Sequence, residues 1–259
     1  MTPRRLEIIA LTGIPLVQPG DDLAALVLAS LERMDLRLEP GDALVVAQKI
    51  VSKAEGRYAA LADVAPSPEA VDLAGNVDKD PRLVELILRE SVAVVRHRPG
   101  LVVVEHRLGF ILANAGIDAS NVEPLESDSE ETRVLLLPED PDGSCRRLRD
   151  AIATATGVAP AVVVNDSIGR AWRNGTVGTA IGAAGLQSLL DLRGETDLFG
   201  RTLRVSQVGL ADELSSAASL VQGEGAEGTP VALIRGFEPS GTDQAAAGLI
   251  RGAEEDMFR

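Results

Sequence analysis

Acidic side chains next to apolar segments are the residues of this sequence best suited to chemistry. Asp118 and Asp166 each follow a short apolar run that predicts a strand, and Ser167 comes directly after the second aspartate. Glu224 lies just beyond the end of a predicted helix, where the helix dipole and free carbonyl groups favour a cation. Such oxygen-rich positions suit a hard divalent ion such as Mg²⁺ or Mn²⁺. A turn or capping role is the alternative for each residue taken alone.

Basic residues near these segments could offset the charge of a phosphorylated substrate. Lys53 and Arg57 follow a predicted apolar strand. The segment Gly169–Gly175 holds the only tryptophan of the chain, between Arg170 and Arg173. Two arginines beside an indole suit a carboxylated or phosphorylated ligand. A surface loop with a packed tryptophan is the alternative.

Several familiar catalytic motifs are missing or out of place. The sequence contains no G-x-x-x-x-G-K-[ST] loop and no H-E-x-x-H motif. Gly223–Gly228 fits G-x-G-x-x-G, but it follows a predicted helix and precedes a predicted strand, the reverse of the order that a dinucleotide needs. The only histidines, His97 and His106, flank a predicted hairpin without metal-ligand spacing, and we interpret them as exposed. A Ser–His–Asp relay is therefore disfavoured.

Composition and charge restrict the partners of the chain. Of its 259 residues 45% are hydrophobic, as in ordinary globular proteins, but only 2% are aromatic, which disfavours base stacking. The net charge of -14 argues against nucleic acid and anionic membranes, and a nucleotide would need a bridging cation or a basic patch. A single cysteine, Cys145, fits a reducing compartment, and neither a membrane helix nor a signal peptide is apparent. We therefore expect a cytoplasmic protein.

Strands and helices do not alternate regularly along the chain. The predicted helices begin at Asp21 or Asp22 and at Asp140 or Asp142, and cover Pro68–Gly75, Pro81–Ser91 and Ala211–Gln222. The predicted strands cover Leu6–Thr12, Ala43–Val51, Phe110–Ala113, Ala161–Val164, Thr202–Val208 and Pro230–Arg235, with a hairpin of Val92–Arg98 and Leu101–His106. This order favours an α+β fold. The acidic stretch Glu126–Glu131 predicts an exposed loop. No domain boundary is visible, so we expect a single domain over residues 1–259, with two lobes as an alternative.

The same segments resemble the coenzyme F-420:γ-glutamyl ligase family. The matching stretches occur in order along the chain, and they are Gly13–Pro15, Pro19–Leu23, Lys49–Arg57, Ala113–Asn121, Leu136–Pro138, Asp140–Asp142, Asp166–Gly175 and Val231–Gly236. No single stretch is decisive, but the ordered set is highly specific.

The resemblance implies a fold, an assembly and a set of ligands. The fold is a family-specific α+β fold with mixed, largely antiparallel sheets, assembled as an intertwined homodimer. Two divalent cations are implied, the first held by Asp118 and Asp166 and the second by Ser167 and Glu224, and a monovalent cation such as K⁺ is compatible. The implied GTP contacts are Ile14, Pro15, Leu16, Val17, Gln48, Lys53, Asn121, Gln222 and Gly223.

The activity implied by the resemblance is GTP-dependent ligation of L-glutamate to the lactyl carboxylate of a deazaflavin coenzyme precursor. GTP would phosphorylate that carboxylate to an acyl phosphate, and the glutamate amine would then displace phosphate while metal ions neutralise the developing charge. Some relatives add further glutamates through γ-linkages. We expect Asp118, Asp166 and Arg173 to act in catalysis, Arg173 by pairing with anionic groups of the precursor.

Three further expectations concern what the chain does not do. The chain stops at Arg259, so the C-terminal nitroreductase-like domain of actinobacterial relatives is not expected. A metal-dependent phosphohydrolase would use the same carboxylates and release phosphate without glutamate. A non-catalytic nucleotide-binding protein is disfavoured, because Lys53, Asp118, Asn121 and Asp166 are all retained.

Overall fold

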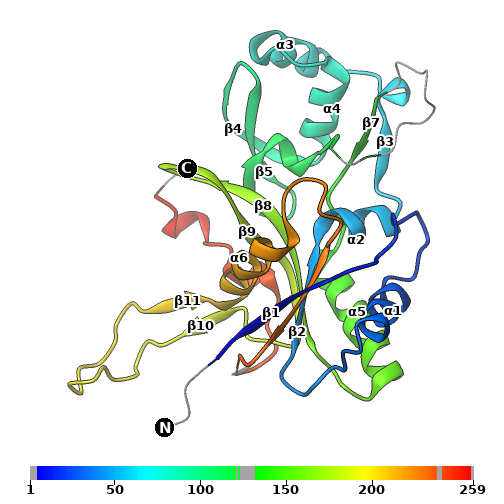
Figure 1. Ribbon diagram of the computed structural model, residues 1–259. Coiled ribbons are helices and arrows are strands. Elements are labelled where there is room, and N and C mark those ends of the chain that lie inside the picture. The colour runs from blue at the N-terminus through cyan, green and yellow to red at the C-terminus, as the bar shows by residue number, and fades with distance from the viewer. Residues whose placement is uncertain (1–4, 121, 123–131, 238–240, 258–259) are drawn as a thin grey trace.

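A mixed five-stranded sheet forms the centre of the protein. The computed structural model describes residues 5–120, 122, 132–237 and 241–257. The strand order in the sheet is β1-β12-β2-β8-β9 (Figure 1). The bounds are Glu7–Leu11 for β1, Val231–Arg235 for β12, Ala43–Ala47 for β2, Ala161–Arg170 for β8 and Arg173–Ala184 for β9. Only β2 and β8 run parallel, and the other neighbouring pairs are antiparallel. The expected α+β class with mixed, largely antiparallel sheets is therefore confirmed.

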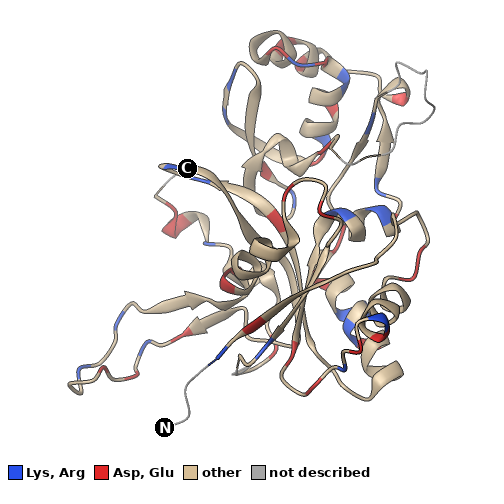
Figure 2. Cartoon of the chain, viewed as in Figure 1, with Lys and Arg blue, Asp and Glu red and all other residues tan. Residues whose placement is uncertain are grey.

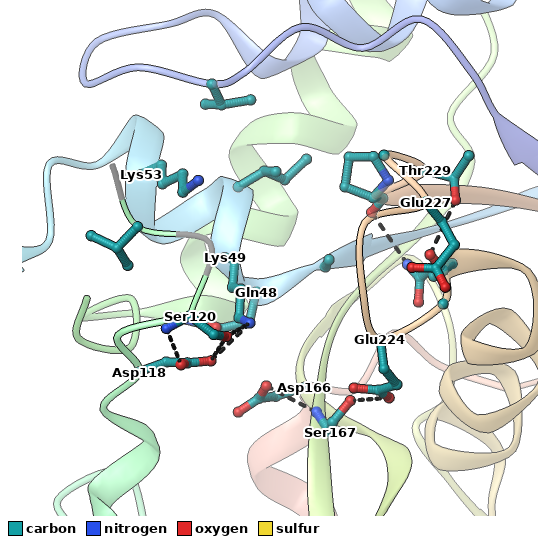
Figure 3. A pocket seen from close by; sticks show the side chains of 18 of the residues that line it. Gln48, Lys49, Lys53, Asp118, Ser120, Asp166, Ser167, Glu224, Glu227 and Thr229 are labelled. Carbon is teal, nitrogen blue, oxygen red and sulfur yellow. Dashed lines mark hydrogen bonds and ion pairs between the residues drawn. The ribbon is translucent and has the colours of Figure 1, made fainter. Parts of the chain in front are cut away.

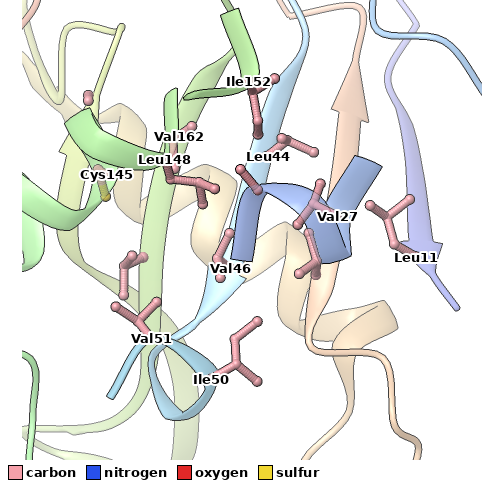
Figure 4. Packing of buried hydrophobic residues seen from close by; sticks show 14 of the residues in the cluster. Leu11, Val27, Leu44, Val46, Ile50, Val51, Cys145, Leu148, Ile152 and Val162 are labelled. Carbon is pink, nitrogen blue, oxygen red and sulfur yellow. The ribbon is translucent and has the colours of Figure 1, made fainter. Parts of the chain in front are cut away.

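Helices cover both faces of this sheet, which explains why its inner strands are apolar throughout. α1 (Leu23–Arg33) and α5 (Pro141–Thr156) pack on one face, and α6 (Leu210–Gln222) packs on the other. Side chains of β2 alternate between the two cores, with Leu44 facing α1 and α5 and Val45 facing α6 (Figure 4). Both cores consist of aliphatic side chains, in keeping with the scarcity of aromatic residues.

A second group of elements, the cap lobe, lies above the central sheet in Figure 1. Its members are α3 (Pro68–Val77), α4 (Pro81–Arg89), β4 (Ser91–Arg98), β5 (Leu101–His106) and β6 (Ile111–Ala113). The cap lobe has its own core, in which helix residues such as Ile87 meet Val102 and Val104 of β5. The small sheet of β3 (Tyr58–Ala60) and β7 (Arg133–Leu135) connects the cap lobe to the central sheet.

A long ribbon extends away from the central sheet (Figure 1). It is built on β10 (Leu189–Asp191) and β11 (Gln207–Gly209), which pair antiparallel. The apolar side chains of Leu198 and Phe199 lie almost fully exposed on it. The predicted strand Thr202–Val208 is therefore wrong over most of its length, because regular pairing is confined to the base of the ribbon.

Short 3₁₀ turns in the described part of the chain are Leu61–Asp63, Asn114–Gly116, Ala246–Leu249 and Ala253–Glu255.

Helix ends follow the capping residues of the sequence. Asp22 and Asp140 accept hydrogen bonds from the first-turn backbone of α1 and α5, and Gly157 ends α5 in the left-handed conformation. The predicted hairpin is also confirmed, since β4 and β5 turn at Pro99-Gly100. Among the described residues, no helix combines the length and apolar character needed to cross a bilayer.

Three sequence interpretations are wrong near the centre of the molecule. The predicted strand Ala43–Val51 ends at Ala47, and Gln48–Ala54 forms the helix α2. The predicted strand Ala161–Val164 continues through Asp166 to Arg170, and the following segment, for which no element was predicted, forms β9. His106 is fully buried instead of exposed, with its Nδ1 accepting from the Leu108 backbone N–H at 3.0 Å.

Glycine is required in β9 because other backbone segments lie directly against that strand. A Cβ atom on Gly178 would lie 2.3 Å from the Ser215 carbonyl oxygen in α6. A Cβ atom on Gly182 would lie 2.5 Å from the Pro141 backbone in α5. Both distances are far below van der Waals contact, so the glycines allow close helix–strand packing on each face of the sheet. The glycines of β9 therefore belong to a tightly packed strand.

Candidate active site

A cavity of about 840 Å³ lies between the central sheet, α2 and the segment 116–120, which follows the last strand of the cap lobe (Figure 3). Segments far apart in the chain form its walls, and these include residues 14–18, the start of α2, residues 116–120 and the loop 222–230. Most of the predicted site residues line this one cavity: Ile14, Pro15, Leu16, Val17, Gln48, Lys53, Asp118, Asp166, Ser167, Gln222, Gly223 and Glu224. Asn121 lies outside the described residues, as does the predicted acidic loop 126–131.

The parallel pair β2–β8 brings two of these segments together. In its register Ala47 lies opposite Asn165, so β2 gives way to α2 beside the point where β8 continues into Asp166. The carboxyl ends of parallel strands meet at one edge of a sheet, and that edge is a common position for a ligand site. Basic residues of α2 consequently lie opposite acidic residues of β8 and of the loop after α6 (Figure 2).

Asp118 is held rigidly at the edge of the cavity by its backbone. Its N–H donates to the Leu135 carbonyl at 3.0 Å, and the Leu135 N–H donates back at 2.8 Å. Its carboxylate lies 2.8 Å from Lys49 Nζ and accepts from the Ser120 N–H at 2.6 Å and from Ser120 Oγ at 3.0 Å. Burial alone would raise the pKa of Asp118, but the Lys49 and Ser120 contacts outweigh it and lower the pKa. Asp118 is therefore an anion at neutral pH.

The surroundings of Asp166 raise its pKa, whereas those of Asp118 lower the pKa of that residue. Its Oδ1 accepts from the Ser167 N–H at 2.9 Å. Burial raises the pKa of Asp166 to about 6, and the nearby carboxylates of Asp118 and Glu224 act in the same direction. The Ser167 hydroxyl donates to Glu224 at 2.5 Å. The cavity thus concentrates more negative charge than its own lysines neutralise, which favours a bound cation.

The donor set fits a divalent cation that shares its coordination with a substrate. All candidate ligands are carboxylate or hydroxyl oxygens, which suit Mg²⁺ or Mn²⁺. In the described part of the chain no three carboxylate, imidazole or thiol groups lie together as a complete protein cage. Mg²⁺ is usually held by one or two carboxylates together with substrate phosphates and water. Asp118 with Asp166, and Ser167 with Glu224, are two sets of that kind.

Residues 13–236 match the family described as F420-0:Gamma-glutamyl ligase. The chain belongs to this family. Relatives named coenzyme F420:L-glutamate ligase align over nearly the whole chain. The relative from Methanothermobacter thermautotrophicus is 45% identical over 257 residues, which are 98% of this chain and 99% of the relative. The relative from Methanopyrus kandleri is 46% identical over 94% of this chain and 93% of its own length. The relative from Archaeoglobus fulgidus is 40% identical over 98% and 97%. The resemblance seen in the sequence is confirmed.

Two amides of this gamma-glutamyl ligase family member support the cavity wall from inside. Gln48 Nε2 donates to Ser52 Oγ at 2.7 Å, so the side chain is held within α2. Gln222 Nε2 donates to the Val45 and Pro230 carbonyls, and its Oε1 accepts from Asn165 at 2.8 Å. Both amides are buried. They remain predicted nucleotide contacts. Gln48 is fixed within α2, whereas Gln222 links the end of α6 to β2, β8 and the residue before β12.

Two predicted basic contacts lie elsewhere. Arg57 is engaged outside the cavity lining, where it donates to the Leu137 carbonyl and pairs with Glu90 and Glu139. Arg173 starts β9 at the turn from β8 and is exposed, so it does not line the cavity. The neighbouring Trp172 is 89% exposed and has a positive φ of 64°. A role for Arg173 with the precursor would therefore place part of that ligand beyond the described cavity.

Lys49 is a charged residue of the cavity that the sequence did not single out. It pairs with Asp118 and donates to Ser120 Oγ at 2.7 Å, and it lines the cavity together with Lys53. The two lysines are four residues apart, which places them on one face of a helix. That signal was present in the sequence, but the strand predicted over Ala43–Val51 concealed it. Lys49 could have been found by treating Gln48–Ala54 as a helix.

Proposed function

We propose that this chain is a GTP-dependent ligase that joins L-glutamate to the lactyl carboxylate of a coenzyme F-420 precursor. The observation that carries the proposal is the convergence of acidic and basic residues from distant segments in one cavity of a member of this family. The relatives are named coenzyme F420:L-glutamate ligase, which gives the coenzyme and glutamate as their substrates. The cavity volume of about 840 Å³ is in the range of small-molecule sites. We place the reaction in the cytoplasm.

The chemistry is set by the poor reactivity of a carboxylate toward an amine. In the proposed reaction the precursor carboxylate attacks the γ-phosphorus of GTP, which gives an acyl phosphate and GDP. The α-amine of glutamate then attacks the acyl carbon, the C–O bond to phosphate breaks, and the amine loses a proton. Divalent cations, when bound, neutralise phosphate charge and polarise the transferred group. Asp118 and Asp166 would hold the first cation, and Ser167 and Glu224 the second.

The remaining cavity residues would bind and orient the substrates. The Lys53 ammonium would pair with a phosphate, and the apolar segment 14–17 would contact the nucleoside. Bound substrates that fill the cavity would also protect an acyl phosphate from water until the amine arrives. In the proposed complex the anionic precursor reaches toward the β8–β9 turn, where Arg173 would pair with it.

The discriminating experiment follows GTP cleavage and product mass together. With GTP and Mn²⁺ alone, cleavage should be slow, and it should rise sharply when the deglutamylated precursor is added. Glutamate should then convert the cleavage into amide, with the product mass giving the number of glutamates added. Arg173→Ala should lower precursor-stimulated cleavage more than basal cleavage. Rapid GTP hydrolysis that ignores both precursor and glutamate would instead identify a phosphohydrolase.

We further propose that the ligase acts as a homodimer. The ribbon between β10 and β11 supports this proposal, because its exposed Leu198 and Phe199 are costly to leave in water. Phe199→Glu should shift the mass measured by light scattering toward the monomer. Leu220→Glu, which alters an exposed apolar residue of α6, serves as the matched control. A wild-type protein that is monomeric at micromolar concentration would exclude the dimer.

A further inference from the structure

Lys49 and Asp118 form a close contact between opposite charges in the cavity. Lys49 Nζ lies 2.8 Å from Asp118 Oδ2 and 2.7 Å from Ser120 Oγ (Figure 3). Lys49 comes from α2 beside the central sheet, whereas Asp118 lies in the segment that leaves the cap lobe. The two side chains are 28% and 36% exposed, so the pair is accessible to solvent ions. An ammonium in this position occupies one of the lone-pair directions that a metal ion would need.

The charge of Lys49 extends beyond this one contact. Asp166 lines the same cavity as Asp118 and Lys49, so the Lys49 charge acts on both carboxylates. The same ammonium therefore compensates both carboxylates proposed to hold the first divalent cation. A divalent cation between these carboxylates would neutralise the same negative charges, with twice the charge of an ammonium.

We infer that Lys49 is a displaceable counter-ion of Asp118, which a divalent cation must expel and which then becomes available to the nucleotide phosphates. The inference rests on the proposed function, because it assumes that Asp118 is a metal ligand. A carboxylate oxygen bound to Mg²⁺ at about 2.1 Å cannot keep an ammonium at hydrogen-bond distance without strong repulsion between the two cations. The Lys49 side chain has four rotatable methylene carbons and can swing while remaining in the cavity.

Displacement of Lys49 couples the binding of metal to the binding of nucleotide. Without nucleotide, the Asp118–Lys49 pair competes with the metal and weakens metal binding. With nucleotide present, the phosphates offer the expelled ammonium a new partner, and the competition disappears. Metal and nucleotide should therefore strengthen each other's binding by more than direct metal–phosphate contact provides, and the coupling is reciprocal.

Lys49→Met tests this coupling, and Lys53→Met is its matched control. Both substitutions remove one positive charge from the same helix and the same cavity wall. Only Lys49 is paired with Asp118 in Figure 3. If only the net charge of the cavity mattered, the two variants should show similar changes in Mn²⁺ affinity. If Lys49 is a displaceable counter-ion, Lys49→Met should change the Mn²⁺ affinity more than Lys53→Met does. Lys49→Arg should restore the wild-type affinity, because the positive charge returns.

Mn²⁺ affinity is measured on the full chain without nucleotide, by calorimetry and by electron paramagnetic resonance of the free ion. Lys49→Met should bind Mn²⁺ about three- to tenfold more tightly than the wild type, the range expected for removing a partly exposed ion pair and its repulsion. Lys53→Met should change the affinity by about twofold or less. In the presence of a non-hydrolysable GTP analogue, the advantage of Lys49→Met should disappear and the analogue should bind more weakly than to the wild type.

Asp118→Asn separates failure of this inference from failure of the proposed function. If the wild type binds no Mn²⁺, or if Asp118→Asn binds it as the wild type does, the proposed metal site is wrong and the inference falls with it. If Mn²⁺ binding needs Asp118 but Lys49→Met is no tighter than Lys53→Met, only the inference is overturned. Tighter Mn²⁺ binding by Lys49→Met alone, with rescue by Lys49→Arg, supports it.

Discussion

Replacing Asp166 by asparagine should stabilise the metal-free protein while destroying its activity. Asn keeps the shape of the side chain and can still accept the hydrogen bond from the Ser167 N–H. It removes the negative charge that burial and the neighbouring carboxylates make costly. The same charge is what a divalent cation would bind. Opposite effects on stability and on metal binding are therefore expected from one substitution.

The raised pKa of Asp166 sets the size of the expected gain in stability. The pKa of Asp166 rises from 3.8 to about 6, and one pH unit corresponds to about 1.4 kcal/mol. The folded carboxylate therefore costs up to about 3 kcal/mol, and less where water screens it. Because the folded pKa is raised, the cost is absent below pH 3.8, grows as the pH rises toward 6, and is constant above that value. The stability gained by Asp166→Asn should follow the same pH profile.

Urea unfolding at pH 4 and pH 8, with and without Mn²⁺, measures this profile. In EDTA the variant should be more stable than the wild type at pH 8 and nearly equal to it at pH 4. Added Mn²⁺ should stabilise the wild type, by about 2.7 kcal/mol at one hundred times its dissociation constant, but not the variant. Turnover should be lost at every metal concentration.

Asp212→Asn is the matched control for Asp166→Asn. Burial also raises the pKa of Asp212, which accepts from the Ala180 N–H on the α6 side of the sheet. This variant should keep its response to Mn²⁺. A destabilised Asp166→Asn protein at pH 8 in EDTA would refute the electrostatic reasoning, and undiminished activity would refute the role of Asp166 as a metal ligand.

The remaining predictions test the nucleotide, the packing and the cap lobe. Lys53→Met should raise the KM for GTP more than that for glutamate in initial-rate kinetics, and an equal change in both would refute phosphate contact. Gly182→Ala should lower the free energy of unfolding by about 1–3 kcal/mol because its Cβ meets the Pro141 backbone, whereas Gly169→Ala has open space and should have little effect. Glu90 has a pKa below 4.5, since its contacts with His106 and two arginines outweigh burial. Its stabilising contribution is therefore present above pH 4.5 and lost in acid. Glu90→Gln should cost most stability near neutral pH in thermal melts.

The sequence was sufficient for features that depend on local chemistry. Capping aspartates and terminal glycines placed most helices, and Pro99-Gly100 placed the hairpin of the cap lobe. Apolar runs identified β1, β12 and the starts of β2 and β8, because few other segments could be buried on both faces. The α+β class followed from their irregular order. These inferences need only short-range information.

Features that depend on tertiary contact were missed. The boundary between β2 and α2 lies within one apolar run, and a short apolar run has no periodicity that separates strand from helix. The glycines of β9 suggest flexibility until the approach of α5 and α6 is known. His106 resembles a hairpin surface residue, but it is buried opposite Ser91, with its Nε2 3.6 Å from the Glu90 carboxylate at the end of α4. In each case the deciding neighbour is distant in the sequence.

The sequence predicted the candidate site residues individually. The structure adds that most of them line one cavity, and this shared position is what indicates a joint role. A chain with a net charge of -14 repels a nucleotide at long range. The cavity adds Asp118, Asp166 and Glu224, so its lysines alone leave an excess of negative charge. A nucleotide accompanied by divalent cations resolves both problems, because the cations satisfy the carboxylates and the phosphates together. Under the proposed function, the acidic residues would therefore favour a nucleotide that arrives with its metal over a nucleotide alone.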